Sequence, residues 1–259
     1  MPDIVRDFYD HLAGSYHLMF EDWEASMARQ ATTLGAILER DLGPGRSQKI
    51  LDCACGIGTQ ALGLADLGFQ VSATDLSPRA IERARAEASA RGLNVAFQVS
   101  DMRDLAQLRE TGFDAVICMD NALPHIDTDE QIVQAASQVH DRLRPGGLFL
   151  VSIRDYDLLI AERPVVQGPA FYADAGRRRV VFQLWDWIDE RRYTFHLYIT
   201  YDTGDGWRTH HDASTYRAIL RSELTNILER AGFRNMQWLM PAESGFYQPV
   251  VIARAARKP

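Results

Sequence analysis

The sequence predicts an α/β fold in which a mostly parallel sheet of seven strands carries helices on both faces. Apolar runs of strand length alternate with helical segments between residues 46 and 154, which is typical of a parallel sheet covered on two sides. A glycine-containing turn, Gly56-Ile57-Gly58, lies between the first strand and its helix. The chain has 259 residues, of which 46% are hydrophobic and 24% charged, so it can bury a substantial core.

The elements expected before residue 155 follow a simple order. Residues 4–42 are periodic enough for two or three amphipathic helices, which end at Gly43-Pro44-Gly45 and make residues 1–45 an N-terminal helical cap. The core, residues 46–154, is then expected to contain strands at 49–53, 70–74, 95–99, 113–118 and 148–153, with helices at 59–67, 78–91 and 129–143.

The pattern changes after residue 154. Aromatic-rich alternating runs at 180–188 and 193–201, joined by Asp189-Glu190-Arg191-Arg192, predict a hairpin. Residues 155–215 are therefore expected to be an antiparallel insertion that covers the substrate at the mouth of the sheet. Residues 216–259 return to the core with a helix at 218–231 and closing strands at 236–240 and 249–253.

Charge and composition exclude several functions. The net charge of −7 argues against a dedicated nucleic-acid binder. Lys49 and Lys258 are the only lysines, so the sequence contains neither a lysine-bearing phosphate loop nor a central lysine for Schiff-base chemistry. A small-molecule partner is expected, and a homo-oligomer remains open.

The three cysteines, Cys53, Cys55 and Cys118, lie in apolar runs and are odd in number, which favours buried thiols in a reducing compartment. No second cysteine or histidine pair stands at zinc spacing, so no metal is expected. The first residues lack a signal pattern and no apolar run reaches about 18 residues. We therefore expect a cytoplasmic protein with no membrane partner.

The glycine turn and the strand after it indicate an adenosine-type ligand. Glycine lets the backbone approach a ligand closely, and Asp75 at the end of the second strand is placed to accept hydrogen bonds from ribose hydroxyls. A dinucleotide and S-adenosylmethionine are the two alternatives. Asp52 beside the turn would repel a pyrophosphate but hold an ammonium, and Ser100-Asp101-Met102 offers an acceptor and an apolar side chain to adenine, which favours S-adenosylmethionine.

A family resemblance follows from these residues. Asp52 to Thr59, with Asp75, Asp101 and strand 113–118, resembles the Rossmann-like class I S-adenosylmethionine-dependent methyltransferases over nearly the whole chain. Strand 113–118 followed by Asn121 and His125, residues 152–157, and Tyr216 resemble the glycine/sarcosine N-methyltransferase group more narrowly.

The resemblance implies methyl transfer from S-adenosylmethionine to the amine of a small substrate such as glycine or sarcosine, with S-adenosylhomocysteine as the second product. The implied cofactor-binding residues are Tyr16, Arg29, Asp52, Ala54, Gly56, Gly58, Asp75, Leu76, Asp101, Met102, Met119 and His125. The implied catalytic residues are Asn121, His125 and Tyr16, and the implied substrate-binding residues are Arg154, Asn121, Tyr172 and Tyr216.

Arg154 closes the fifth strand, at the edge where open α/β sheets bind ligands. A guanidinium can grip a carboxylate with two parallel hydrogen bonds, and the resemblance implies that Arg154 holds an amino acid in this way. The alternative is an internal salt bridge from Arg154 to Asp155 or Asp157.

The loop after the fourth strand carries two further candidates. The resemblance makes Asn121 an acceptor that orients the substrate and His125 a neighbour of the cofactor's sulfur. The alternatives are that Asn121 caps a turn and that His125 only packs. The sequence departs from the family here, because Asp120 stands where a small residue is usual and Pro124 precedes His125.

Other features admit ordinary explanations. Arg177-Arg178-Arg179 is interpreted as a solvated hairpin edge rather than a phosphate site, and His210-His211-Asp212 as a loop rather than a metal site. The aromatic residues of the hairpin either form core or line a pocket for an alkylated amine. Rival functions are a small-molecule O-methyltransferase, a nucleic-acid methyltransferase and a non-catalytic binding protein.

Overall fold

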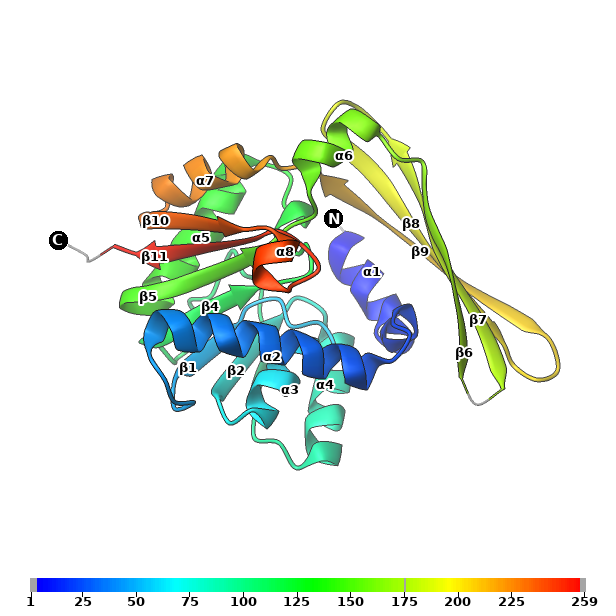
Figure 1. Ribbon diagram of the computed structural model, residues 1–259, viewed down its shortest axis with the longest axis horizontal. Coiled ribbons are helices and arrows are strands. Elements are labelled where there is room, and N and C mark those ends of the chain that lie inside the picture. Colours follow the sequence, from blue (N-terminus) through cyan, green and yellow to red (C-terminus); the bar gives the residue numbers. More distant parts are fainter. Residues whose placement is uncertain (1–3, 175, 257–259) are drawn as a thin grey trace.

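The computed structural model describes residues 4–174 and 176–256, and the chain folds into two sheets with helices around the larger one (Figure 1). Residues 1–3, where the sequence lacks a signal pattern, and Lys258 lie outside the described residues. Among the described helices, none is long and apolar enough to cross a membrane.

The larger sheet has seven strands in the order β10-β11-β5-β4-β1-β2-β3. They are β1 (Lys49–Asp52), β2 (Gln70–Asp75), β3 (Ala96–Val99), β4 (Phe113–Cys118), β5 (Leu143–Ser152), β10 (Phe233–Leu239) and β11 (Val250–Ala255). Neighbours from β3 to β5 pair in parallel, whereas β11 pairs antiparallel with both β5 and β10. This confirms the predicted Rossmann-like, mostly parallel sheet of seven strands.

Helices cover both faces of this sheet because its strands are apolar on both sides. Alternate residues such as Leu51 and Val116 pack with α5 (Asp129–Arg142) and α7 (Arg221–Arg230) on one face. Their neighbours, such as Ile50, pack with α2 (Trp23–Leu42) and α3 (Thr59–Asp66) on the other. The remaining core helix is α4 (Pro78–Arg91). The sheet is thereby fixed between two layers, with only the ends of its strands open to ligands.

The N-terminal segment forms the predicted helical cap. It consists of α1 (Ile4–Leu12), the short 3₁₀ helix η1 (Tyr16–Met19) and α2, which begins where the Asp22 side chain accepts a hydrogen bond from the Ala25 N–H at 2.9 Å. In Figure 1, α1 lies between the larger sheet and the smaller one, and it contacts the last strand of the latter. This position brings α1 to the edge where the strands of the larger sheet end.

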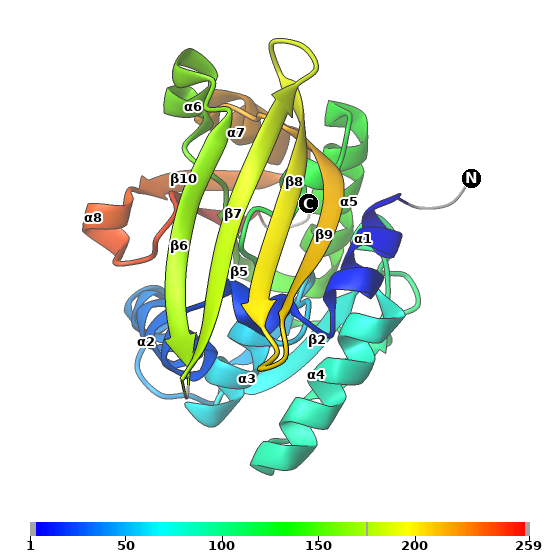
Figure 2. The same ribbon diagram turned by 90° about the vertical axis from the view of Figure 1, so that its right-hand side faces the viewer.

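The smaller sheet, called the second sheet below, contains four antiparallel strands in the order β6-β7-β8-β9 and follows α6 (Tyr156–Glu162). They are β6 (Val166–Asp174), β7 (Arg177–Trp187), β8 (Arg192–Asp202) and β9 (Trp207–Arg217). Figure 2 shows this sheet as a separate layer with α1 beside β9. The predicted hairpin is confirmed as β7 and β8, while β6 and β9 were not predicted.

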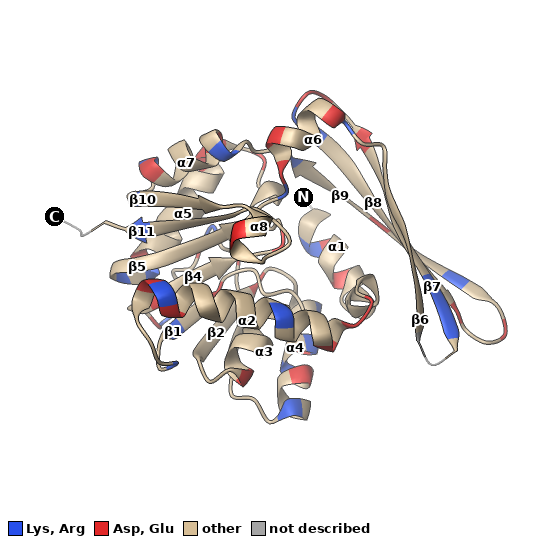
Figure 3. Cartoon of the chain, in the orientation of Figure 1, with Lys and Arg blue, Asp and Glu red and all other residues tan. Residues whose placement is uncertain are grey.

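The assignment of His210, His211 and Asp212 to a loop is wrong, because they belong to β9 and pair with residues 197–199 of β8. Residues 207–211 are all exposed, so the apolar alternation that identifies a half-buried strand is missing there. Figure 3 shows the basic residues at the far end of β7, where Arg177 and Arg178 are exposed as predicted.

Arg179 departs from the predicted solvated edge, since it is only 6% exposed and its Nη2 donates a hydrogen bond to the Phe20 carbonyl oxygen at 2.7 Å. It joins the second sheet to the segment before α2. Cys53, Cys55 and Cys118 are buried free thiols, as expected. The two remaining short elements are η2 (Leu123–His125) and α8 (Pro241–Ser244).

Candidate active site

Two adjoining cavities open at the carboxyl ends of the parallel strands, where α/β sheets bind their ligands. The first, here called the loop cavity, has a volume of about 740 Å³ and is lined by the loops that follow β1 to β4. The second, here called the inter-sheet cavity, has a volume of about 640 Å³ and reaches the second sheet. Tyr9, Tyr16 and Asp120 line both cavities and therefore mark where the two meet.

The loop cavity collects most residues that the sequence assigned to a cofactor. The predicted residues that line it are Tyr16, Ala54, Gly56, Asp75, Leu76, Asp101, Met102, Met119 and His125. Because they follow parallel strands that are adjacent in the sheet, the loops containing most of them converge on one edge.

Asp75 and Gly56 have the geometry that an adenosine ligand requires. The Asp75 carboxylate accepts hydrogen bonds from the Gly56 N–H at 2.8 Å and the Ser77 N–H at 2.9 Å, which fix its orientation. Each carboxylate oxygen keeps a lone pair for a ribose hydroxyl. Gly56 has φ +53°, and a Cβ at this position would meet nothing within 4 Å, so the turn leaves a cradle for a ligand. Burial raises the pKa of Asp75, and its backbone donors oppose that shift.

Two predicted residues, Asp52 and Gly58, lie behind the loop cavity rather than in its lining. Asp52 is fully buried, accepts a hydrogen bond from the Ala54 N–H at 3.3 Å, and has a pKa that burial raises well above the usual range. Gly58 begins α3 with φ +98°, and a Cβ there would approach Leu62 to 3.0 Å. Both residues shape the turn, and their predicted direct contacts with the cofactor stay predictions.

Asp101 lines the loop cavity with its carboxylate paired to Arg103, whose Nη2 lies 2.5 Å from Oδ2. Met102 supplies the apolar surface expected beside adenine. With a buried acceptor at Asp75, a glycine cradle and an apolar wall, the residues of the loop cavity fit S-adenosylmethionine.

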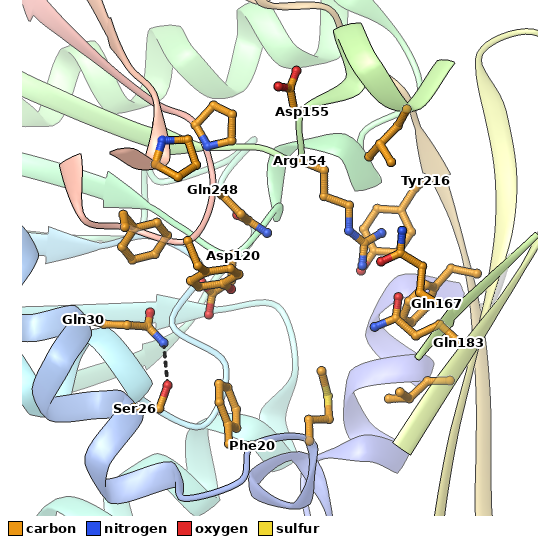
Figure 4. Close-up of a pocket in the computed structure, with 18 of the residues that line it drawn as sticks. Phe20, Ser26, Gln30, Asp120, Arg154, Asp155, Gln167, Gln183, Tyr216 and Gln248 are labelled. Atoms are coloured by element: carbon orange, nitrogen blue, oxygen red, sulfur yellow. Dashed lines mark hydrogen bonds between the residues drawn. The ribbon is translucent and has the colours of Figure 1, made fainter. Parts of the chain in front are cut away.

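The inter-sheet cavity is assembled from distant parts of the chain (Figure 4). Its apolar walls come from the N-terminal segment, α6 and the second sheet: Phe8, Leu12, Met19, Phe20, Leu158, Leu159, Trp185, Phe195 and Leu197. Its polar groups include Arg154, Gln167, Gln183 and Gln248, which Figure 4 shows around the opening. The cavity is therefore largely apolar with a few polar groups, as in sites that bind small molecules.

Arg154 follows β5 and is held by aromatic side chains. Its Nη1 donates a hydrogen bond to the Tyr193 hydroxyl at 2.7 Å, and its guanidinium carbon lies 4.7–5.2 Å from the centres of three rings, Trp185, Phe195 and Tyr216. These contacts orient the guanidinium and leave donor groups for a ligand.

The rival salt bridge of Arg154 is not formed. Asp155 and Asp157 pair instead with Arg221, at 2.5 and 3.6 Å. Within residues 4–174 and 176–256, no carboxylate lies at ion-pair distance from Arg154. A permanent positive charge without an anionic partner in the described chain therefore faces the inter-sheet cavity.

The core of the chain is similar in sequence to known proteins. Residues 50–147 match a family model described as a methyltransferase domain. Residues 50–147 of this chain are therefore similar to methyltransferase domains.

Two curated relatives illustrate the range of similar methyltransferases. The chain is 36% identical to a ubiquinone biosynthesis O-methyltransferase from Xanthomonas axonopodis pv. citri over 40% of this chain and 42% of the relative. It is 27% identical to a glycine/sarcosine N-methyltransferase from Aphanothece halophytica over 62% of each chain. The chain thus spans less than two thirds of the length of either relative.

A solved structure shows that the similarity of fold extends further. The structure of S-adenosylmethionine-bound CalS10, an amino pentose methyltransferase from Micromonospora echinaspora, superposes with a TM-score of 0.73 at 19% identity, covering 94% of this chain and 95% of that one. The methyltransferase fold therefore includes the second sheet as well as the core.

Asn121 lines neither of the two cavities. It is 1% exposed with φ +66°, its Nδ2 donates to the Tyr156 hydroxyl at 2.9 Å, and its Oδ1 accepts from the Arg154 N–H at 3.0 Å. Both ends of its amide are thus used inside the protein. The predicted contact with substrate is corrected to a positioning role beneath Arg154.

His125 lines the loop cavity as a neutral ring. Its Nε2 is 2.9 Å from the Tyr9 hydroxyl, its Nδ1 is 3.3 Å from the Ser214 hydroxyl, and its ring centre lies 4.0 Å from that of Tyr216. Burial lowers the pKa of His125 to about 3, and the charge of Arg154 acts in the same direction. The ring therefore packs against its neighbours and also lines the loop cavity, where the cofactor is expected. Its low pKa makes it a weak base.

The remaining candidates divide between the cavities. Tyr216, a predicted substrate-binding residue, lines the inter-sheet cavity, and burial raises its pKa to about 12. Arg29 lines the inter-sheet cavity rather than the loop cavity and is exposed, and its contact with the cofactor stays a prediction. Tyr172 lines neither cavity, because its ring packs against the Arg179 guanidinium at 5.0 Å.

Sequence reasoning did not assign a role to Tyr9 and Asp120, which line both cavities. Tyr9 carries no motif, since it is one aromatic residue on an amphipathic helix. Asp120 could have been found from the sequence, because the sequence departs from the family it resembles at that position.

Proposed function

We propose that this chain methylates the amine of a small substrate that also carries a carboxylate, with S-adenosylmethionine as the methyl donor. Arg154 is the observation that carries the proposal, because its guanidinium faces the inter-sheet cavity without an anionic partner in the described chain. Glycine and sarcosine are the smallest members of this substrate class.

The loop cavity would hold the donor. Asp75 is placed to accept hydrogen bonds from ribose, Met102 to cover adenine, and Tyr16 to face the boundary between the cavities. When bound, S-adenosylmethionine supplies a methyl group that is already electrophilic. The protein is then required mainly to position the acceptor and exclude water.

Arg154 would fix the acceptor by its carboxylate. The three surrounding rings and the Tyr193 hydroxyl hold the guanidinium in one orientation, so a carboxylate bound there presents its amine in a defined direction. Asn121 supports this arrangement by accepting a hydrogen bond from the Arg154 backbone.

The size of the inter-sheet cavity favours a substrate with an apolar body. Glycine has five heavy atoms and fills roughly 150 Å³ if each takes the ~30 Å³ of a liquid water molecule. The cavity volume is about 640 Å³, and much of the lining is aromatic or aliphatic. We therefore infer that larger carboxylated amines, such as aromatic amino acids, bind better than glycine or sarcosine.

Methylation of an oxygen acceptor is the second candidate, because one relative is named as an O-methyltransferase. The obvious base for a hydroxyl acceptor would be His125. Its pKa of about 3 makes it a weak base, which supports the amine acceptor instead. A protein that binds S-adenosylmethionine without chemistry would show no turnover with either acceptor.

The test is transfer of a labelled methyl group to matched acceptors. We expect the wild-type protein to prefer phenylalanine to phenethylamine, which lacks only the carboxylate, and to leave tyramine oxygen unmodified. Arg154→Gln should raise the KM for phenylalanine about 100-fold, from the loss of a charge-assisted bidentate contact, and abolish the preference. Arg178→Gln, at an exposed site outside both cavities, is the matched control. Unchanged discrimination by Arg154→Gln would contradict the proposal.

A further inference from the structure

Asp120 stands at the junction of the two cavities. It follows β4, lines both the loop cavity and the inter-sheet cavity, and adopts φ +56°, a left-handed conformation that costs most residues free energy. Figure 4 shows Asp120 across the inter-sheet cavity from Arg154. A group at this junction is next to both the donor and the acceptor of the proposed reaction.

Hydrogen bonds hold the Asp120 carboxylate in place. The Tyr247 hydroxyl donates to its Oδ1 at 2.6 Å, and Gln60 Nε2 donates to its Oδ2 at 2.7 Å. The Asp120 N–H donates to the Ser152 hydroxyl oxygen at 2.8 Å. Because each carboxylate oxygen can accept two hydrogen bonds, one acceptor position remains on each.

The charge of Asp120 is uncompensated. Within the described residues, no arginine, lysine or histidine lies at ion-pair distance from it. A partly buried carboxylate without a cation is unfavourable by itself, and it favours a cationic group of a ligand. An ammonium in the inter-sheet cavity would supply that charge.

The surroundings of Asp120 set how readily it takes a proton. The titratable groups that face it are Tyr247 after α8, Tyr16 in η1, Tyr216 in β9, Asp52 in β1 and, across the cavity, Arg154 after β5. Burial raises the pKa of Asp120, and the hydrogen bonds from Tyr247 and Gln60 oppose that shift. A carboxylate with a raised pKa is a better proton acceptor at neutral pH than an ordinary surface carboxylate.

We propose that Asp120 binds the ammonium group of the substrate and accepts its proton before methyl transfer. The inference rests on the proposed function, in which the acceptor is an amine. It assigns a catalytic residue where this sequence departs from the family it resembles, while Arg154 holds the other end of the same substrate.

The proton and electrons balance in two steps. An N–H bond of the ammonium breaks, the proton moves to an Asp120 oxygen, and the bonding pair stays on nitrogen as a lone pair. That lone pair then forms a bond to the methyl carbon while the carbon–sulfur bond breaks and leaves its electron pair on sulfur. Asp120 afterwards releases its proton to water, which restores the carboxylate.

Asp120→Asn is the first test, because the amide keeps the size of the side chain but removes its charge and basicity. At pH 7 we expect kcat/KM for the amine to fall about 100- to 1,000-fold, which is the lower part of the usual range for loss of a general base. The defect should shrink at pH 9.5, where more of the amine is already neutral in solution. Affinity for S-adenosylhomocysteine, measured by calorimetry, should change less than threefold.

Tyr247→Phe is the second test and leaves the carboxylate in place. Losing the Tyr247 hydroxyl removes a hydrogen bond that lowers the pKa of Asp120, so that pKa rises. Because the ionised carboxylate is the active form, the acid limb of kcat/KM against pH should move to higher pH. Tyr201→Phe is the matched control, since its hydroxyl contacts His210 and it lines neither cavity.

Several outcomes would overturn the inference. If Asp120→Asn weakens S-adenosylhomocysteine binding more than tenfold and keeps the wild-type pH profile, Asp120 serves the cofactor. If amine turnover is unchanged by Asp120→Asn, or if the acid limb stays in place in Tyr247→Phe, Asp120 accepts no proton. Should Asp120→Asn fail to fold, the shift in Tyr247→Phe decides. A wild-type protein that methylates hydroxyls and no amine would instead refute the proposed function.

Discussion

The two cavities are built in different ways. The loop cavity is lined largely by loops after β1 to β4, and its central carboxylate, Asp75, is oriented by backbone N–H groups. The inter-sheet cavity draws on α1, η1, α2, the second sheet and residues 241–249, and its central guanidinium, Arg154, is oriented by side chains. The first construction depends on the order of the strands and the second on side chains that are far apart in sequence.

This difference indicates a division of labour. A site made of strand-end loops is a property of the fold, and it suits the donor that a whole class of enzymes shares. A site made of distant side chains can change without disturbing the sheet, so it suits the acceptor, which differs between enzymes. Substitutions should therefore separate donor binding from acceptor binding.

The largest effect is expected for Asp75→Ala. Affinity for S-adenosylhomocysteine should fall about 1,000-fold, or about 4 kcal/mol, because charge-assisted hydrogen bonds to ribose and the support of the Gly56 turn are lost together. Asp66→Ala, at an exposed position at the end of α3, is the control for calorimetry. Unchanged affinity in Asp75→Ala would disprove the assignment of the loop cavity.

Asn121→Ala tests the link between the cavities. The Arg154 N–H loses its partner and the Tyr156 hydroxyl keeps only the Tyr193 hydroxyl. Because alanine also tolerates φ +66° poorly, the free energy of unfolding should fall by about 3 kcal/mol in urea. Asn121→Gly should be about 1 kcal/mol more stable than Asn121→Ala, because glycine accepts this φ value. Equal stability of the two variants would show that the backbone conformation relaxes.

The neutral state of His125 predicts how stability depends on pH. Its pKa is about 3 in the folded protein and about 6.5 when unfolded, so the unfolded chain binds more protons between these values and stability falls as pH decreases through that window. Between pH 6.5 and 4.5 the wild-type protein should lose about 2 kcal/mol relative to His125→Gln. A constant difference between the two unfolding free energies would mean that His125 is not buried as a neutral ring.

The smallest effect concerns how the second sheet attaches to the N-terminal segment. Arg179→Ala should cost about 1 kcal/mol because the hydrogen bond to the Phe20 carbonyl is lost. Arg178→Ala should cost less than about 0.5 kcal/mol, since that side chain is 68% exposed in its ion pair with Asp202. Thermal unfolding of both variants would show whether the buried Arg179 contributes more to stability than the exposed Arg178.

The sequence predicted the larger sheet well because local and global preferences agree there. The helix at residues 78–91 and the strand at 113–118 have the predicted boundaries in α4 and β4, where the apolar pattern is continuous. The outer strands β6 and β9 escaped prediction because they are exposed over much of their length, so alternation is weak. The same reasoning explains why the hairpin of β7 and β8, which is partly core, was found.

The candidate site was predictable only where chain order determines position. Ala54, Gly56, Asp75 and Asp101 follow consecutive strands, so their convergence follows from a parallel sheet. Arg29 and the residues of η1 reach their places through the packing of helices, which no local pattern records. Tyr172 was assigned through the family resemblance, and its ring packs against Arg179.

The sequence by itself determined the α/β core, the loop after β1 and the class of ligand that such a loop accepts, because the alternation of strands and helices and the glycine turn are local properties. Only the tertiary structure decided that Asn121 supports Arg154, that His125 is neutral and that Asp120 stands between the cavities without a cation in the described chain. These three properties depend on burial and on partners that are more than 30 residues away or that belong to other elements. The free energy of a charge is set by such surroundings rather than by its neighbours in sequence.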